Sequence, residues 1–493
     1  MKNLVVPGYE VWGHLGEGGM SEVWLAKHVA LAAPVVVKTL RRELRATTPD
    51  AADRILSEAR LMARVSSPRI VRALDAGHVI DEGQPTPYLV QEYVDGLDFA
   101  ELDRRRRVAL GVGLPLWTVC RVMCEVCMGL RAAHQAGVIH RDLKPSNVFG
   151  DPEIGIRLGD FGIAVARSDT SVPEGAVGAG TPAFMAPEQL RRGEIGRFTD
   201  VWGAGATACD LRYGRGPFAN VEELLDPDTP PRLPQPASPA EAYFQDVIRR
   251  MVAKDLAVRP RDILAPLAHF TMLSNAIEPP PPVATRTLAH ELGVGRVQLR
   301  FVVGDIADAS VAAIVSSANF KMRMELGVAG ALKARGGAEI EEEAMRNGEQ
   351  ALGSCVRTGA GALEARHVFH AVSAWSEVSC VGRAFARALL LADEQGCATL
   401  AAPALGTGVG RVSIEMCASA MMNTLRRHVM LGGTRLRELT IWLDSEAKRA
   451  VYQDVAEEVL GIYHRHTGPA DIGLTDDSAA RGDAATCVDP DSH

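Results

Sequence analysis

Two short segments carry side chains that could together transfer a phosphoryl group. HRDLKPSN (140–147) supplies Asp142 and Asn147, and DFGIA (160–164) supplies Asp160. In one shared site, Asp142 would accept the proton of an attacking hydroxyl, while Asn147 and Asp160 would bind the Mg²⁺ of a polyphosphate. Each motif alone also occurs as polar loop residues without a common site. Their order along the chain, with a glycine loop and a lysine upstream, favours a single catalytic site for phosphoryl transfer.

The upstream segment HLGEGGMSEVWLA (14–26) carries Gly16, Gly18 and Gly19 where we expect a tight strand–turn–strand. Glycine lets backbone N–H groups approach phosphates, although a plain hairpin turn would have the same composition. The next apolar run, VVVK, ends at Lys38, whose ammonium could reach the α and β phosphates. Glu58, twenty residues further on in a predicted helix, could pair with Lys38 and fix its position.

Size and composition limit the class of protein. The chain has 493 residues, which favours two domains over one core. A net charge of −8 argues against nonspecific nucleic-acid binding. Nine scattered cysteines indicate reduced thiols, and we interpret Cys120, Cys124 and Cys127 as buried residues of a helix, not as a metal or redox site. No segment is apolar for long enough to span a bilayer and no signal peptide is apparent, so we expect a cytoplasmic protein.

Composition shifts divide the chain into four parts. Short apolar runs between turn signals predict a strand-rich lobe over 9–98 with one helix, and the pattern from 116 to 272 is mostly helical. Four prolines, Pro279–Pro282, indicate a stiff linker. Strands then alternate with helices, as in a layered α/β domain, and an acidic tail follows that we expect to lack fixed structure. The predicted ranges are 9–272, 273–287 (linker), 288–464 and 465–493.

The motifs of residues 9–272 resemble those of bacterial eukaryotic-like Ser/Thr protein kinases. This resemblance implies a bilobal α+β fold that uses ATP and Mg²⁺ to phosphorylate Ser/Thr side chains of proteins. Asp142 and Lys144 would then be catalytic, and Asn147 and Asp160 would bind the metal. The residues expected at the nucleotide are Gly16, Glu17, Gly18, Gly19, Val23, Lys38, Glu58, Glu92 and Val94. Gln91 stands at the gatekeeper position.

The same resemblance assigns supporting roles. Glu188 of the APE motif would pair with Arg259, and Asp200 would brace the catalytic loop. Arg141, next to the catalytic Asp142, suggests that a phosphate on Ser168, Thr170 or Ser171 controls the kinase. The alternative, that these three are ordinary solvated hydroxyls, is equally consistent with the sequence. We interpret the basic run Arg104–Arg107 as the solvated start of a helix, in preference to a dock for acidic substrates.

The second domain carries polar and glycine-rich segments at the ends of its predicted strands: VVGDI, AIVSSAN, GVAGAL and APALGTGVG. Glycine-rich loops at the carboxyl edge of a parallel sheet suit a diphosphate held by backbone amides. Asp305 could accept a hydrogen bond from an adenine amino group, and Asn319 could hold ribose hydroxyls. Each also has a simpler interpretation, as a turn aspartate and a helix-capping asparagine.

Together these segments resemble the macro domain, a three-layer α/β/α fold that binds ADP-ribose. The resemblance implies a site lined by Asp305, Ile306, Asn319, Gly327, Val328, Ala329, Gly406, Thr407, Gly408, Val409 and Gly410. The sequence departs from the family at SSAN, where Ser316 replaces an asparagine, and at Glu325 and Leu326, which replace glycines in a loop that faces an anion. Ala329 stands where hydrolytic relatives often have an aspartate.

For the whole chain, we expect a Ser/Thr kinase whose second domain binds ADP-ribose or ADP-ribosylated protein, and thereby recruits substrates or regulates the kinase. Two alternatives remain: an active ADP-ribosyl hydrolase regulated by the kinase, and a degenerate scaffold. No membrane or nucleic-acid partner is expected.

Overall fold

The computed structural model describes residues 4–17, 21–41, 51–81, 83–151, 155–161, 182–277, 284–288, 291–375, 378–408 and 410–461. Gly18, Gly19, Val409, the phosphorylation candidates, the four linker prolines and the acidic tail therefore lie outside the described residues. Over the described ranges, no helix is both long and apolar enough to cross a bilayer.

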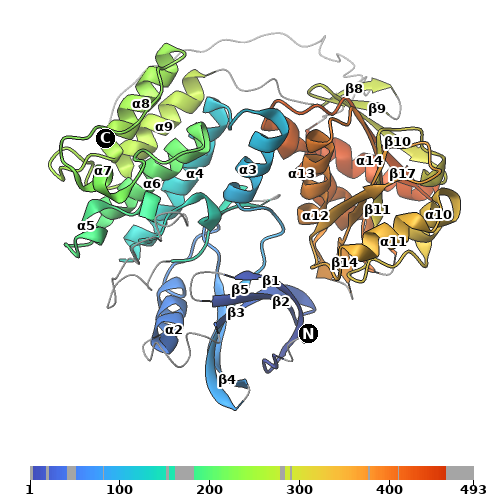
Figure 1. Cartoon of the computed structure of the whole chain (residues 1–493), viewed down its shortest axis with the longest axis horizontal. Helices are drawn as coiled ribbons and strands as arrows, with labels where there is room; N and C mark the ends of the chain where they lie inside the picture. The colour runs from blue at the N-terminus through green and yellow to red at the C-terminus, as the bar shows by residue number, and fades with distance from the viewer. Residues whose placement is uncertain are drawn as a thin grey trace, which may run out of the picture. The chain divides into compact units, whose positions relative to one another are not determined.

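The first part of the chain folds into an antiparallel sheet with one helix beside it (Figure 1). The sheet order is β1-β2-β3-β5-β4, as expected for consecutive hairpins with one inserted helix. The helix α2 comes between the third and fourth strands in sequence and packs on β4 and β5. The elements are β1 (Tyr9–Glu17), β2 (Ser21–His28), β3 (Ala33–Leu40), α2 (Ala51–Met62), β4 (Ala73–Asp81) and β5 (Gln84–Glu92).

The helical part that follows is built around α4 (Leu116–Gln135), which packs against α6 (Arg197–Tyr213) and α9 (Leu264–Ala276). Cys120, Cys124 and Cys127 are buried along α4, so the interpretation as core residues is confirmed. The remaining elements are α3 (Phe99–Leu110), η1 (Pro145–Asn147), β6 (Val148–Asp151), β7 (Gly155–Leu158), η4 (Pro182–Phe184), α5 (Pro187–Leu190), α7 (Val221–Leu225) and α8 (Pro239–Met251).

The interpretation of Arg104–Arg107 as a solvated helix start is wrong. Helix α3 begins earlier, where Asp98 accepts a hydrogen bond from Glu101 N at 2.8 Å, and ends at Gly111, whose φ of 73° suits glycine. Arg104 is exposed, but Arg106 is only 1 % exposed. Its guanidinium donates to the carbonyl oxygens of Leu431 and Gly432, which no local sequence pattern could foretell.

The second domain has an eight-stranded sheet in the order β12-β13-β11-β16-β17-β10-β9-β8. The five central strands, from β13 to β10, are parallel, and both edges are antiparallel. The five strands expected from sequence are all present. β11, β13 and β16 are apolar runs buried on both faces, whereas buried and half-buried residues alternate along β10. The strands are β8 (Ala284–Leu288), β9 (Glu291–Val294), β10 (Val297–Val303), β11 (Ala313–Ser317), β12 (Cys355–Gly359), β13 (His367–Ala371), β16 (Thr399–Pro403) and β17 (Glu438–Leu443).

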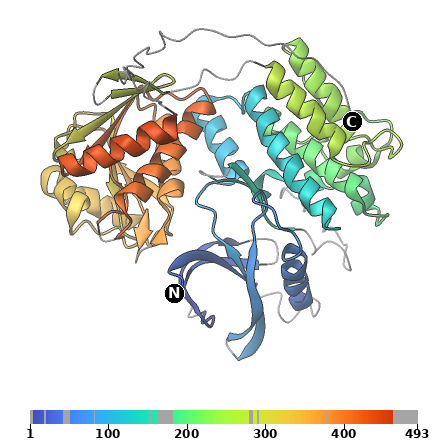
Figure 2. The ribbon, with the colours of Figure 1, turned by 180° about the vertical axis from the view of Figure 1, so that it is seen from behind.

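Helices cover both faces of this sheet, which gives three layers. One hydrophobic cluster joins the sheet to α12 (Val381–Glu394), α13 (Ile414–Met430) and α14 (Glu446–Leu460), and α14 is the red-orange helix that crosses the sheet in Figure 2. A second cluster lies on the other face under α10 (Gly327–Gly336) and α11 (Glu339–Arg346). The shorter elements are η5 (Ile306–Asp308) and a hairpin of β14 (Ala374–Trp375) and β15 (Val378–Ser379).

Candidate functional site

The two motifs of the first domain meet in one site. Lys144 Nζ donates to Oδ2 of Asp142 at 2.8 Å, and Asn147 Nδ2 donates to the same oxygen at 3.2 Å. Asn147 Nδ2 also lies 3.5 Å from the backbone oxygen of Asp160. Because the amide nitrogen is engaged by these acceptors, the side-chain oxygen of Asn147 is the atom that could bind a cation. The carboxylate of Asp160 is the second oxygen donor, and such donors fit Mg²⁺.

Lys38 reaches this site from β3. Its ammonium forms an ion pair with Asp160 and lies 4.0 Å from Oε1 of Glu58 on α2. The expected ion pair of Lys38 with Glu58 is therefore present, but at a long separation. Asp160, which the sequence did not suggest as a partner of Lys38, lies closer. Burial alone would lower the pKa of Lys38, but the carboxylates of Asp160 and Glu58 outweigh it and raise that pKa. Lys38 therefore carries a positive charge where phosphates could bind.

Asp200 supports the catalytic loop, as predicted. This residue is 1 % exposed, and its carboxylate accepts hydrogen bonds from the backbone nitrogens of His140 and Arg141, both at 2.8 Å. A third contact joins Oδ2 to His134 Nε2 at 2.7 Å. These bonds hold the residues that precede Asp142, so the position of its carboxylate is set from within the core.

The second predicted support is also confirmed. Arg259 Nη1 donates to Oε1 of Glu188 at 2.7 Å, and Thr199 Oγ1 donates to the same oxygen at 3.0 Å. The guanidinium lies over the ring of Trp202, 4.9 Å from its centroid. The pair anchors α5 to the helical core.

Arg141 has an unused donor. Its Nε is buried and has no hydrogen-bond partner among the described residues. An unengaged arginine donor is what control by a nearby phosphate would require, but the candidates Ser168, Thr170 and Ser171 lie outside the described part of the chain.

The expected hinge, residues 91–94, begins in the last two residues of β5. Gln91 is buried, and its amide donates to Sδ of Met62 at 3.0 Å, so it forms part of the wall behind the site. The side chain of Glu92 pairs with Arg72 and Arg157, and Val94 is buried. Val23 lies opposite Lys38 in the β2–β3 ladder, and Gly16 ends the β1 side of the glycine loop. The side chains of Gln91 and Glu92 are thus engaged. Part of the hinge backbone is engaged too, because Glu92 N donates to Arg72 O at 3.0 Å and Val94 O accepts from Gly96 N at 2.9 Å.

The second domain has a cavity of about 840 Å³ at the carboxyl ends of its parallel strands. Every predicted site residue of this domain that the structure describes lines it: Asp305, Ile306, Asn319, Gly327, Val328, Ala329, Gly406, Thr407, Gly408 and Gly410. The ends of β10, β11 and β16 and the start of α10 meet here, as the sheet topology requires.

Asp305 and Asn319 are engaged by their own loops. Asp305 Oδ1 accepts from Ala307 N at 2.9 Å. Asn319 Oδ1 accepts from the backbone nitrogens of Lys321 and Arg323 at 3.0 and 3.2 Å, and its Nδ2 donates to Arg323 O at 2.7 Å. The interpretation of Asp305 as a turn aspartate is confirmed, because its side chain caps η5. The interpretation of Asn319 as a helix cap is wrong, because its bonds hold the loop 319–323, in which no helix begins. A ligand would have to share or replace these bonds.

Comparison with known proteins identifies both domains. Residues 9–265 match the family model described as "Protein kinase domain", and residues 315–421 match the model described as "Macro domain". The chain belongs to the protein kinase family. The kinase match covers the whole catalytic constellation, whereas the macro match begins within β11 and ends within α13.

Two curated relatives of the kinase domain are bacterial. The serine/threonine-protein kinase Pkn1 of Myxococcus xanthus is 36 % identical over 270 residues, which is 52 % of this chain and 36 % of that protein. PknB of Mycobacterium leprae is 36 % identical over 211 residues, or 43 % of this chain and 33 % of PknB. The chain thus spans about a third of the length of these relatives.

Among solved structures, the chain is similar to the kinase domain of PknI from Mycobacterium tuberculosis. The sequence identity is 25 % and the TM-score 0.43, with 55 % of this chain and 99 % of that one covered.

Sequence reasoning missed several residues around the macro-domain cavity: Phe320, Lys321, Arg323, Trp442, Asp444 and Lys448. Trp442 and Asp444 belong to the strand motif ELTIWLD, so the rule that placed Asp305 at a strand end could have found them. Lys448 is on α14 and forms an ion pair with Asp444 at 2.6 Å; because it lies only four residues after Asp444, the same rule followed by i, i+4 spacing could have found it. The cavity therefore has basic residues of its own beside the glycine loops.

Proposed function

We propose that the kinase domain is an ATP-dependent protein kinase that phosphorylates serine or threonine. The observation that carries this proposal is the shared set of contacts among Asp142, Lys144 and Asn147, with the Lys38–Asp160 pair opposite. Asp142 accepts the proton of the substrate hydroxyl, and Lys144 neutralises charge on the phosphoryl group. Lys38 positions the α and β phosphates. Asn147 and Asp160 would hold a magnesium ion, which would offset the charge on the polyphosphate.

Loss of the proposed base tests this function. Asp142→Asn keeps the size and the hydrogen-bond geometry of the side chain but removes its basicity. Autophosphorylation of the full chain should fall by roughly 10² or more, as for loss of a general base. Asp246→Asn, on the exposed surface of α8, is the matched control and should retain full activity. Equal phosphorylation by the Asp142→Asn variant and the wild type would contradict the assignment.

For the macro domain we propose binding of ADP-ribose or ADP-ribosylated protein. The large cavity, its glycine loops and the N-terminus of α10 supply backbone donors for a diphosphate. We favour binding over hydrolysis because Ala329, 5 % exposed beside the cavity, offers no side-chain base. The recruitment of modified substrates to the kinase domain follows from such binding.

Calorimetry of the full chain with ADP-ribose tests this second proposal. Heat of binding at or below millimolar ligand is expected. Ala331→Glu, which places a carboxylate in the cavity wall, should abolish it by repelling the diphosphate. Absence of heat with the wild type would overturn the proposal, and release of ADP-ribose from a modified protein would favour the hydrolase alternative.

A further inference from the structure

A carboxylate of the kinase domain caps a helix of the macro domain. Asp95, three residues after the hinge residue Glu92, accepts hydrogen bonds from Gly382 N at 2.7 Å and Arg383 N at 2.9 Å. These are free N–H groups of the first turn of α12, whose own N-cap residue, Cys380, provides no side-chain cap. A helix N-terminus favours a negative charge and needs such an acceptor. A carboxylate of the kinase domain therefore satisfies backbone donors of the macro domain.

A bidentate ion pair lies one helical turn further along α12. Arg387 donates to Glu101 of α3 through Nε at 2.8 Å and through Nη2 at 2.7 Å. Burial alone would raise the pKa of Glu101, but the hydrogen bonds and charge of Arg387, with those of nearby arginines, lower it to about 2. Glu101 is thus charged at neutral pH and held in a fixed geometry.

The opposite charge pattern occurs at a helix C-terminus. The guanidinium of Arg106 on α3 donates to Leu431 O at 3.0 Å and Gly432 O at 2.9 Å, just beyond the end of α13. A cation is favourable there because the last carbonyls of a helix carry partial negative charge. Arg106 is therefore buried because the macro domain supplies the carbonyl acceptors that its guanidinium needs.

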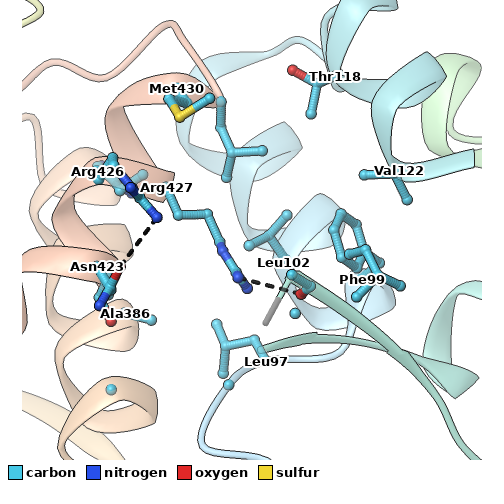
Figure 3. A pocket seen from close by; sticks show the side chains of 18 of the residues that line it. Leu97, Phe99, Leu102, Thr118, Val122, Ala386, Asn423, Arg426, Arg427 and Met430 are labelled. Carbon is cyan, nitrogen blue, oxygen red and sulfur yellow. Dashed lines mark hydrogen bonds between the residues drawn. The ribbon is translucent and has the colours of Figure 1, made fainter. Parts of the chain in front are cut away.

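A cavity of about 380 Å³ lies beside these contacts, between α3 and α4 of the kinase domain and α13 of the macro domain. Figure 3 shows Phe99, Leu102 and Val122 on its kinase side. Arg427 extends from α13 to donate to Gly155 O at 3.3 Å. The interface is thus held by a few directed bonds around open space, which leaves it room to adjust.

The macro domain also reaches the other lobe of the kinase. One hydrophobic cluster contains Leu25 of β2 and, packed against it, Leu15 of β1 and the hinge residue Tyr93. The same cluster contains Met322 and Phe320 of the macro domain. Leu15 immediately precedes Gly16 of the glycine loop, so the macro domain contacts the strands that carry that loop. The macro domain thus contacts both lobes of the kinase domain and spans the hinge between them; we call this set of contacts the brace.

The part of the macro domain in this cluster is also a wall of the proposed ADP-ribose cavity. Ala318, Asn319, Phe320 and Lys321 line the cavity, and Ala318 and Phe320 pack in the shared cluster. The bonds of Asn319 to Lys321 and Arg323 set the shape of this segment. If Asn319 turns to a ribose, at least one of these bonds must be replaced, and the segment that supports β1 and β2 shifts.

We propose that ADP-ribose in the macro-domain cavity weakens ATP binding by the kinase domain, through movement of residues 318–322 against β1 and β2. This regulation rests on the proposed function, because it requires ADP-ribose to bind. Without ligand the macro domain supports β1 and β2, and with ligand this support is lost. Coupling between two sites typically changes affinity by a factor of about 5 to 150.

The docked arrangement is tested by charge reversal in the full chain. Glu101→Arg and Arg387→Glu each break the ion pair, and the double variant restores it with the charges exchanged. Hydrogen exchange of the Gly382 and Arg383 amides should be slow in the wild type, faster in each single variant and slow again in the double variant. Glu222→Arg, the same change at an exposed site on α7, is the control. Unchanged exchange in both single variants would overturn the docking.

Coupling is tested by the KM for ATP with and without saturating ADP-ribose. We expect at least about a fivefold rise in the wild type and no rise in Glu101→Arg, whose brace is released. An equal rise in both proteins would mean that ADP-ribose competes at the ATP site, and would overturn the proposal. Calorimetric binding with an unchanged KM would overturn the coupling alone, whereas absence of binding would overturn the proposed function as well.

Discussion

The carboxamide of Asn147 donates from Nδ2 both to the backbone oxygen of Asp142, at 2.7 Å, and to its carboxylate, at 3.2 Å. One side chain thus orients the proposed base and, through its remaining oxygen, offers a ligand for magnesium. In the proposed function, the same residue would set the positions of both base and metal.

Removal of this carboxamide should weaken magnesium binding. In Asn147→Ala we expect the Mg²⁺ concentration for half-maximal autophosphorylation to rise by about 10–100-fold. Asn220→Ala, which removes the cap of α7 away from the site, should leave the Mg²⁺ dependence unchanged. Identical Mg²⁺ titrations of Asn147→Ala and the wild type would contradict the proposed role.

The buried pair Glu188–Arg259 should contribute strongly to stability. In Glu188→Ala the guanidinium of Arg259, which is fully buried, loses its counter-ion, so we expect a loss of about 3–5 kcal/mol in the free energy of unfolding. Asp246→Ala breaks the exposed pair with Arg250 and should cost about 0–1 kcal/mol. Urea unfolding measures the free energy of unfolding of both variants. Similar losses in the two would show that burial of the ion pair does not determine how much it stabilises the protein.

The stability of the macro domain should depend on pH through His370. This residue is fully buried beside Thr358, and burial lowers its pKa from the ordinary 6.5 to about 4. The unfolded chain binds the proton more readily, so the contribution of His370 is present above pH 6.5 and is lost as the pH falls towards 4. The loss should reach about 3 kcal/mol at most.

His370→Gln cannot titrate and should flatten this pH dependence when the urea unfolding of the full chain is measured between about pH 7 and pH 4. His78→Gln, at an exposed histidine of the kinase domain, serves as the control. An equally steep decline in stability for His370→Gln would assign the effect to other groups.

The departures from the macro family at Glu325 and Leu326 should reduce affinity for a diphosphate. Both side chains line the cavity and are exposed, and Glu325 is held by Arg323 at 3.3 Å. Because exposed charges are screened, Glu325→Gln should tighten ADP-ribose binding only about twofold, which corresponds to about 0.5 kcal/mol. The gain should vanish at high salt. Calorimetry at two salt concentrations measures it, with Glu349→Gln at another exposed position as the control; a gain that persists at high salt would exclude a Coulombic origin.

The sequence predicts local features of this protein well. The apolar runs of β10, β11, β13, β16 and β17 identify the parallel sheet, and motif order alone brings Asp142, Asn147 and Asp160 together. It also predicts Glu188–Arg259, because both residues belong to motifs of one family. The short edge strands β9 and β12 give too few residues for a periodic pattern to be recognised.

Contacts between the domains were not predictable. Asp95–Gly382 and Glu101–Arg387 join residues almost 300 positions apart, and neither partner has an unusual local sequence. Arg106 illustrates the reason: a basic helix face is normally solvated, and only the end of α13 makes it favourable to bury. For the same reason Asn319 could be placed at the cavity, but the bonds that hold its loop could not be foreseen.

The proposed roles of Asp142, Asn147 and Asp160 are best tested by a crystal structure of the full chain with Mg²⁺ and a non-hydrolysable ATP analogue. We expect a magnesium ion about 2.1 Å from the side-chain oxygen of Asn147 and from a carboxylate oxygen of Asp160, with the terminal phosphate beside Asp142. An analogue bound elsewhere, or a metal ion that contacts neither Asn147 nor Asp160, would contradict these roles.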